Sequence, residues 1–129
     1  MTLDSSALVA ILFAEPGYLE LVDAVLEADV VRIGAPTLVE TGMVLAGRRG
    51  SPVGRELDGL VRELGITVVP FGEPEWQRAL NACNRYGRGR HAAGLNFGDC
   101  LAYATAVVAG DTLLFVGNDF RKTDIRPAL

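Results

Sequence analysis

The sequence predicts an α/β fold, a three-layer α/β/α sandwich whose central sheet is mostly parallel. Short apolar runs rich in β-branched residues alternate with longer helical patterns, the order that joins parallel strands through helices. The chain has 129 residues, of which 50% are hydrophobic and 22% charged, enough to bury one apolar core. The sequence contains no internal repeat and no low-complexity segment, so we expect a single domain over residues 1–129.

The first half of the chain alternates short strands with helices. We expect, in order, a strand at 1–3, helices at 5–14 and 18–28, a strand at 30–35 and a helix at 36–50. Serines start the first helix and Pro16 ends it, and the third helix has Pro36 and Gly50 at the ends that these residues favour. In the second helix one face is predicted to carry the apolar positions Leu19, Val22, Val25 and Leu26.

The second half of the chain continues this alternation. The predicted elements are a helix at 51–64, a buried strand at 66–71, a helix at 74–86, a loop at 87–96, a helix at 97–108 and a strand at 112–117. Gly110 stands where glycine commonly closes a helix. Strands and helices that alternate in this way predict a parallel sheet covered by helices.

The charge of the chain is acidic overall and basic in one short segment. A formal net charge of −4 argues against a nucleic-acid partner, because phosphate binding usually accompanies a basic balance. However, 11 of the 12 basic residues are Arg, and Arg85, Arg88 and Arg90 lie close together in the sequence. A local basic rim on an acidic protein is therefore compatible with this composition.

Neither the N-terminus nor the cysteines indicate export or a membrane. The first apolar run has no basic segment before it and breaks at Glu15 and Pro16, far short of the roughly 20 residues of a membrane span. Cys83 and Cys100 lack the spacing of a zinc or redox motif, so we expect both to be reduced, buried and without a functional role. These features predict a cytoplasmic protein that does not contact a membrane.

Four carboxylates are predicted to meet at one edge of the sheet. Asp4 follows the first strand, and Glu40 lies near the start of the helix after the second strand. Asp99 begins a helix that leads into the last strand, and Asp119 follows that strand. In a parallel sheet the carboxyl ends of the strands share one edge, where ligands bind. The topology therefore brings together acids that are far apart in the chain.

A cluster of these acids predicts a bound divalent cation. Like charges in contact repel one another and raise one another's pKa unless a cation lies among them. Carboxylate oxygens without nearby His or Cys ligands favour Mg²⁺ or Mn²⁺ over zinc. Such an ion can deprotonate a water, direct it at phosphorus and stabilise the leaving oxygen. The pattern therefore predicts metal-dependent hydrolysis of phosphate esters.

Two other interpretations compete with this one. In a non-catalytic interaction module, Asp4 and Asp99 would cap helices, Asp119 would form an Asx turn and Glu40 would be solvated. A Mg²⁺-binding phosphoacceptor signalling domain would need adjacent acids after the first strand and an Asp at the end of the middle strand. Here Ser5 and Ser6 follow Asp4, and residues 66–71 contain no Asp. Metal titration distinguishes the interaction module from a metal-binding site.

Four segments of the sequence together resemble one known family. They are LDSSALVAIL with Asp4, APTLVETGMVL with Glu40, LNFGDCLAYATA with Asp99 and LLFVGNDFRKTDI with Asp119. In order and spacing they are similar to the PIN-domain ribonucleases, specifically the VapC-type toxins of type II toxin–antitoxin (VapBC) pairs. The resemblance extends from Met1 almost to the C-terminus.

This resemblance implies a PIN-like fold and an endoribonuclease that uses Mg²⁺ or Mn²⁺, cleaves RNA and is inhibited by a cognate VapB-type antitoxin. It implies that Asp4, Glu40, Asp99 and Asp119 are the catalytic, metal-holding quartet, with Ser6 and Asp124 in supporting positions. Members of the family usually form homodimers with basic residues along a shared groove. The candidates here for contact with RNA are Arg85, Arg88, Arg90, Arg121 and Lys122.

Overall fold

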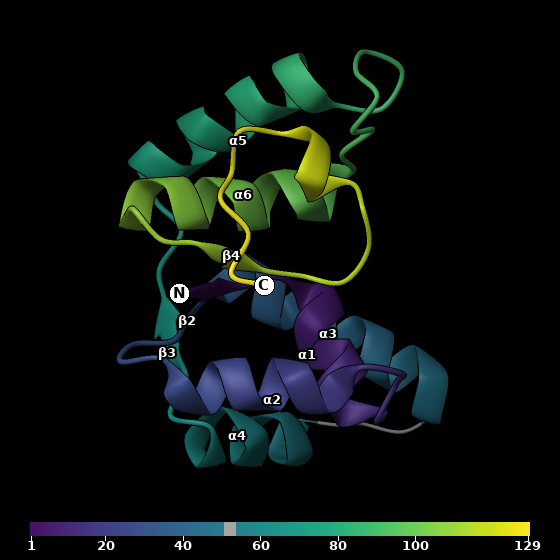
Figure 1. The fold of residues 1–129 in the computed structure, drawn as a ribbon. Coiled ribbons are helices and arrows are strands. Elements are labelled where there is room, and N and C mark those ends of the chain that lie inside the picture. The colour runs from purple at the N-terminus through teal and green to yellow at the C-terminus, as the bar shows by residue number, and fades with distance from the viewer. Residues whose placement is uncertain (51–53) are drawn as a thin grey trace.

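Four parallel strands form one sheet in the order β3-β2-β1-β4, with helices on both faces (Figure 1). The structure is a computed structural model and describes residues 1–50 and 54–129. The strands are β1 (Thr2–Leu3), β2 (Arg32–Gly34), β3 (Thr67–Val69) and β4 (Leu113–Leu114). The helices are α1 (Ser5–Leu12), α2 (Tyr18–Glu27), α3 (Ala35–Arg49), α4 (Gly54–Glu63), α5 (Glu73–Tyr86), α6 (Phe97–Ala109) and the 3₁₀ helix η1 (Phe120–Lys122). The predicted fold class is confirmed.

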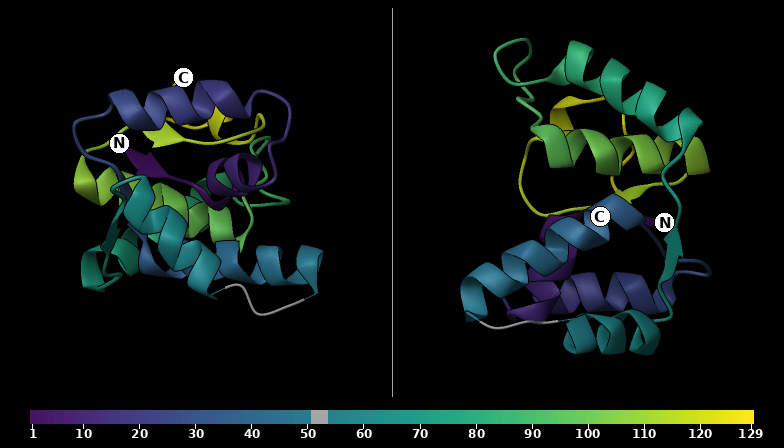
Figure 2. Two further views of the ribbon diagram at one scale, coloured as in Figure 1. Left: turned by 90° about the horizontal axis from the view of Figure 1, so that it is seen from below. Right: turned by 180° about the vertical axis from the view of Figure 1, so that it is seen from behind.

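Two apolar clusters lie on opposite faces of the sheet. On one face α5 and α6 pack against each other and over the sheet, and their cluster includes Ala104 and Leu113 (Figures 1 and 2). On the other face α1, α2 and α4 contribute to a cluster that includes Leu8 and Ile33. Leu113 and the next residue, Leu114, belong to different clusters, because successive side chains of a strand point to opposite faces. The sheet thus lies between the two helical layers.

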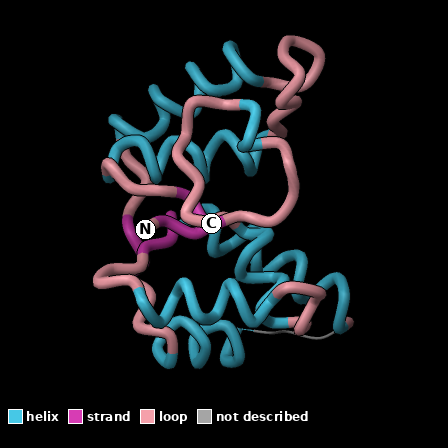
Figure 3. The backbone as a smooth tube through the Cα atoms, in the orientation of Figure 1, coloured by secondary structure: helices cyan, strands magenta, loops and turns pink. Residues whose placement is uncertain are grey.

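The strands of the sheet are short, and beyond the end of β4 a hydrogen bond to a side chain takes the place of strand pairing. Figure 3 shows that helices and loops make up most of the backbone. The predicted strand at 112–117 is too long, because β4 pairs with a β1 strand of only two residues. Beyond it, the N–H of Val116 donates to the Ser6 hydroxyl at 3.0 Å. This bond ties the segment after β4 to the start of α1.

Two predictions about apolar faces are wrong. Strand β3 is not buried, since it is an edge strand, and its Val68 is 42% exposed. In the predicted apolar face of α2, Val25 is buried, but Leu19 and Leu26 are 62% and 67% exposed, and Leu21, outside that face, is buried instead. Helix α2 is apolar over a wide arc, and its packing against α1 decides which stripe is buried.

The helix ends follow the local sequence signals. Helix α3 has Pro36 in its first turn and ends at Gly50, whose φ of 68° is in the left-handed region. Helix α6 ends in the same way at Gly110, with a φ of 69°. The predicted helix at 51–64 corresponds to α4, and residues 51–53 lie outside the described residues. Across the described helices, none combines the length and the hydrophobicity that crossing a bilayer requires.

Candidate active site

Asp4 leaves β1 at the carboxyl edge of the sheet and caps α1. Its Oδ2 atom accepts hydrogen bonds from the Ser6 N–H at 3.0 Å and from the Ser6 hydroxyl. Asp4 is 3% exposed, and within the described structure its buried Oδ1 atom has no hydrogen-bond partner. Burial raises the pKa of the Asp4 carboxyl, and the hydrogen bonds from Ser6 oppose this shift only partly. Asp4 is therefore a helix cap that keeps one carboxylate oxygen unused.

Glu40 lies on α3 against the first turn of α6. A Cβ atom at Gly98 would lie 2.2 Å from Glu40 Oε1, so this close approach requires glycine at position 98. The Oε2 atom of Glu40 is buried and, among the described residues, has no hydrogen-bond partner. Burial raises the pKa of Glu40, and the negative charge of Asp99 raises it further. Glu40 is thus a half-buried carboxylate held between two helices.

Asp99 is fixed by a reciprocal pair of hydrogen bonds at the start of α6. The Asn96 N–H donates to Asp99 Oδ2 at 2.8 Å, and the Asp99 N–H donates to Asn96 Oδ1 at 2.9 Å. This capping box orients the carboxylate and satisfies two N–H groups of the first turn. Burial raises the pKa of Asp99, and Asp4 and Asp119 raise it further. The capping role is therefore real, and it coexists with proximity to other acids.

The negative charge of each of the four acids raises the pKa of another one. Asp119 is exposed, precedes η1 and makes no capping hydrogen bond within the described structure, yet its charge contributes to the raised pKa of Asp99. The charge of Glu40 in turn contributes to the raised pKa of Asp4, and that of Asp99 to the raised pKa of Glu40. The topology thus brings the acids near one another at the carboxyl edge of the sheet.

The chemistry of these side chains fits a divalent cation coordinated largely by water. Their ligand atoms are carboxylate oxygens, which suit Mg²⁺ or Mn²⁺, and Asp4 and Glu40 each have an oxygen without a partner in the described structure. Over residues 1–50 and 54–129, however, no three His, Cys, Asp or Glu side chains form a group that could enclose an ion. Mg²⁺ commonly binds through one or two carboxylates and completes its coordination with water and substrate phosphate.

Comparison with known proteins identifies the family. The sequence pattern of the PIN domain matches residues 1–126. The chain belongs to the PIN domain family. This PIN domain is 44% identical over 125 residues to Ribonuclease VapC of Mycolicibacterium smegmatis, with 97% of each chain covered. It is 43% identical over 126 residues to Ribonuclease VapC30 of Mycobacterium tuberculosis, covering 97% of this chain and 95% of the relative.

Two solved structures share the fold of this PIN domain. The crystal structure of the sarcin–ricin loop cleaving toxin VapC20 of Mycobacterium tuberculosis superposes with a TM-score of 0.75 at 18% identity, covering 98% of both chains. A chain of a toxin–antitoxin complex from Klebsiella pneumoniae gives a TM-score of 0.68 at 19% identity, covering 95% of this chain and 92% of that chain. At such low identity these likenesses show the arrangement of helices and strands.

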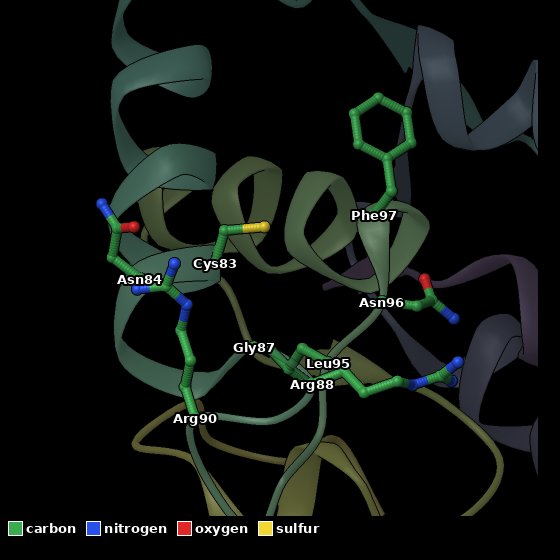
Figure 4. A pocket seen from close by; sticks show the side chains of 8 residues that line it. All are labelled: Cys83, Asn84, Gly87, Arg88, Arg90, Leu95, Asn96 and Phe97. Atoms are coloured by element: carbon green, nitrogen blue, oxygen red, sulfur yellow. The ribbon is translucent and has the colours of Figure 1, made fainter.

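Arg88 and Arg90 line a pocket of about 320 Å³ beside the start of α6 (Figure 4). Neither guanidinium makes a hydrogen bond or an ion pair with another described residue. The positive charge of Arg88 also lowers the pKa of Asp99, although burial outweighs it. The pocket is lined by Cys83, Asn84, Gly87, Arg88, Arg90, Leu95, Asn96 and Phe97. Of the basic residues predicted to contact RNA, Arg88 is the one whose charge acts on Asp99, and Arg90 lines the same pocket.

Arg85 and Asp124 instead interact with each other. The Arg85 guanidinium donates to Asp124 at 2.9 Å and lies 4.7 Å from the centroid of the Tyr86 ring. Asp124 also accepts a 2.6 Å hydrogen bond from the Tyr103 hydroxyl, which is the main cause of its lowered pKa. None of the four acids is among these partners. In the described structure Asp124 therefore contacts none of the four acids, and its supporting role stays a prediction.

Arg121 and Lys122 make contacts with backbone carbonyl oxygens. The Arg121 guanidinium donates to the carbonyl of Leu129 at 3.4 Å, and the Lys122 ammonium donates to the carbonyl of Ala92 at 3.1 Å. Both side chains belong to exposed residues, so an RNA phosphate could compete for them. Their role in RNA binding stays a prediction.

Sequence reasoning overlooked two residues that shape the site. Asn96 holds Asp99 through the capping box, and the spacing of Asn96 and Asp99 is a recognisable signal for this motif. Gly98 has no side chain, and this allows Glu40 to contact the surface of α6. No local pattern indicates this contact, because it depends on how α3 crosses α6.

Proposed function

We propose that this PIN domain is an endoribonuclease, the toxin of a type II toxin–antitoxin pair, that hydrolyses RNA phosphodiester bonds with Mg²⁺ or Mn²⁺. The observation that carries the proposal is the set of four carboxylates of which each raises the pKa of another, while Asp4 and Glu40 keep oxygens that are unpartnered in the described structure. Identities of 44% and 43% to ribonucleases over nearly the whole chain support RNA as the substrate. In this proposal residues 1–129 act as one nuclease domain in the cytoplasm.

Different residues of the chain would hold the metal ion, orient its ligands and attract the substrate. Asp4 and Asp99 would hold the ion with Glu40 and Asp119, directly or through water, and the bound ion would supply an activated water and stabilise the leaving oxygen. Ser6 orients the Asp4 carboxylate, and the capping box of Asn96 orients that of Asp99. These contacts fix the two acids before substrate arrives. Arg88, whose charge acts on Asp99, would attract a phosphate toward them.

Cleavage of RNA by the Asp99→Asn variant tests this proposal. Asn keeps an oxygen that can accept the Asn96 N–H, so we expect the variant to fold, while RNA cleavage in Mg²⁺ or Mn²⁺ falls at least about 100-fold because a metal-holding charge is lost. Fluorescently labelled RNA incubated with protein freed of antitoxin gives the rate, with EDTA as the metal-free control.

Asp58→Asn is the matched control. Asp58 is an exposed acid on α4, which lies on the opposite side of the sheet from α6. It should cleave like the unmodified chain. Full activity of Asp99→Asn, or activity that persists in EDTA, would refute the metal site. A folded Asp99→Asn variant and an unmodified chain that are both inactive on RNA would instead favour a non-catalytic interaction module.

We infer that a cognate VapB-type antitoxin inhibits the chain. The structural similarity to a chain of a toxin–antitoxin complex supports such a partner. The acid cluster also defines what such a partner needs there, because a Lys or Arg side chain inserted among the carboxylates would replace the charge of the metal. We therefore expect the antitoxin to place a basic residue near Asp4 and Asp99.

We also infer a homodimer, from exposed apolar side chains on three neighbouring helices. Trp76, Leu80 and Phe97 are 51%, 55% and 76% exposed and line an apolar pocket of about 330 Å³ between α5 and α6. Val39 and Met43, 63% and 70% exposed, are two further large apolar side chains, on α3, which contacts α6. A monomeric protein seldom exposes so many large apolar side chains together.

A further inference from the structure

Helices α5 and α6 bring the two cysteines of the chain into contact. The Sγ atoms of Cys83 and Cys100 lie 3.2 Å apart, although 17 positions separate the residues in the sequence. In Figure 4 the Cys83 side chain extends from α5 toward α6. Cys100 directly follows Asp99 and is 1% exposed. The thiols predicted to be without a role therefore form a pair beside the acid cluster.

We propose that Cys83 and Cys100 form an oxidative modification site, at which a hydroperoxide produces a disulfide that joins α5 to α6 and slows RNA cleavage. The Cys83 sulfur attacks one peroxide oxygen, the O–O bond breaks, and Cys83 becomes a sulfenic acid as water leaves. The Cys100 sulfur then attacks the Cys83 sulfur, the S–O bond breaks, and a second water carries away the hydroxyl and the Cys100 proton. Two thiols thus give two electrons to one hydrogen peroxide.

The two thiols differ in exposure, and this difference indicates which of them reacts with the peroxide first. Cys83 is partly exposed and lines both the pocket of Arg88 and the apolar pocket of Trp76, so a small peroxide can reach it. Cys100 is buried and meets the oxidised sulfur across the helix interface. Reducing conditions in a cytoplasm would return the pair to thiols, which is the usual behaviour of disulfides there.

The disulfide would act on the site through α6. The two sulfur atoms must approach by about 1 Å to reach the bond length of about 2.0 Å. This movement draws the first turn of α6 toward α5 and away from Glu40, which contacts it at Gly98. The covalent ring also encloses Arg88, the capping box of Asn96 and Asp99 itself. This effect on rate rests on the proposed nuclease function, whereas the disulfide does not.

Mass spectrometry tests the disulfide without any assay of activity. The reduced full chain is treated with one equivalent of hydrogen peroxide, and we expect a mass loss of about 2 Da, because two hydrogen atoms leave. After trypsin cleavage, the peptides 79–85 and 91–121, which carry the two cysteines, should be recovered as one linked species that reductant separates. The cross-link should also raise Tm by roughly 5–10 °C.

Two single variants identify the order of the steps. Cys100→Ala should accumulate Cys83 sulfenic acid that dimedone traps, and Cys83→Ala should leave Cys100 largely unoxidised because it is buried. The modification site is overturned if both thiols of the treated chain are still alkylated by iodoacetamide in denaturant. It is also overturned if linkage occurs only between two chains.

The same preparations then test the effect on cleavage. We expect the oxidised chain to cleave RNA at least about tenfold more slowly, since displacing a catalytic group by 1 Å can cost about 100-fold, and reductant should restore the rate. Peroxide should not change the rate of Cys83→Ala. Equal rates in both redox states would refute the regulatory effect, while an inactive reduced chain would refute the nuclease proposal and leave the disulfide standing.

Discussion

Two carboxylates in this PIN domain have a structural role as helix caps and are also the acids proposed to hold the metal. Asp4 caps α1 through one oxygen and leaves the other buried and unpartnered in the described structure. Asp99 caps α6 and is surrounded by like charge. A cap fixes the position of a carboxylate, so the residues that start these two helices would present rigidly held oxygens to the proposed metal.

Asp4→Asn should stabilise the fold at neutral pH when no metal is present. The pKa of Asp4 is raised in the folded protein, so the carboxylate is less favourable there than in the unfolded chain, and the folded state loses stability as pH rises through that pKa. Asn can still accept the Ser6 hydrogen bonds. We expect the Tm of the variant in EDTA to exceed that of the unmodified chain by a few degrees at pH 7.

Thermal unfolding across pH checks the sign of this effect. The gain should shrink as pH falls, and it should vanish below about pH 4, where the unmodified carboxyl is protonated in both states. Asp58→Asn, the same change at an exposed acid on α4, is the control for the substitution itself. A variant that is less stable than the unmodified chain at pH 7 would mean that the cap needs the full charge of Asp4.

The crossing of α3 and α6 sets the geometry between Glu40 and Asp99. Gly98→Ala places a Cβ atom within 2.2 Å of Glu40 Oε1, so the Glu40 side chain must move. We expect RNA cleavage to fall about tenfold or more while the free energy of unfolding changes by less than about 1 kcal/mol, because Ala favours a helix and the displaced group is a flexible side-chain end.

Gly59→Ala is the control for this helix substitution. Gly59 lies within α4, and a Cβ atom there meets nothing within 4 Å. It should gain roughly 0.5–1 kcal/mol of stability and cleave RNA at the unmodified rate. Denaturant unfolding and the cleavage assay measure both quantities. If the two alanine variants cleave equally well, the contact between Glu40 and α6 is dispensable.

Local sequence signals predict where the helices and strands of this fold begin and end better than they predict which side chains the neighbouring elements bury. Gly50 and Gly110 mark helix ends because their backbone conformation is a property of one residue. The edge position of β3 and the buried stripe of α2 depend on neighbours distant in sequence, and there the predictions fail. The order of strands does predict that Asp4 and Asp99 converge, whereas the thiol pair depends on how α5 folds back on α6.

For the whole molecule, the proposed homodimer would use the exposed apolar side chains around the pocket between α5 and α6. Leu80→Glu would put a charge beside Trp76 and Phe97 in the apolar pocket. Leu80 is 55% exposed in the single chain, so the substitution should leave the fold and its Tm nearly unchanged. We expect light scattering after size-exclusion chromatography to show a dimer for the unmodified chain and a monomer for the variant.

Leu26→Glu is the control variant, because it tests whether a charge at any exposed leucine disrupts the dimer. Leu26 is 67% exposed on α2, on the opposite side of the sheet from α5, and its variant should stay dimeric. If Leu26→Glu is monomeric and Leu80→Glu is dimeric, the copies associate through α2 instead. Two copies joined near α6 would each bring an acid cluster to the interface, because Phe97 and Asp99 lie in the same first turn of that helix. An RNA strand bound along the interface would then contact the basic pocket of Arg88 from both copies.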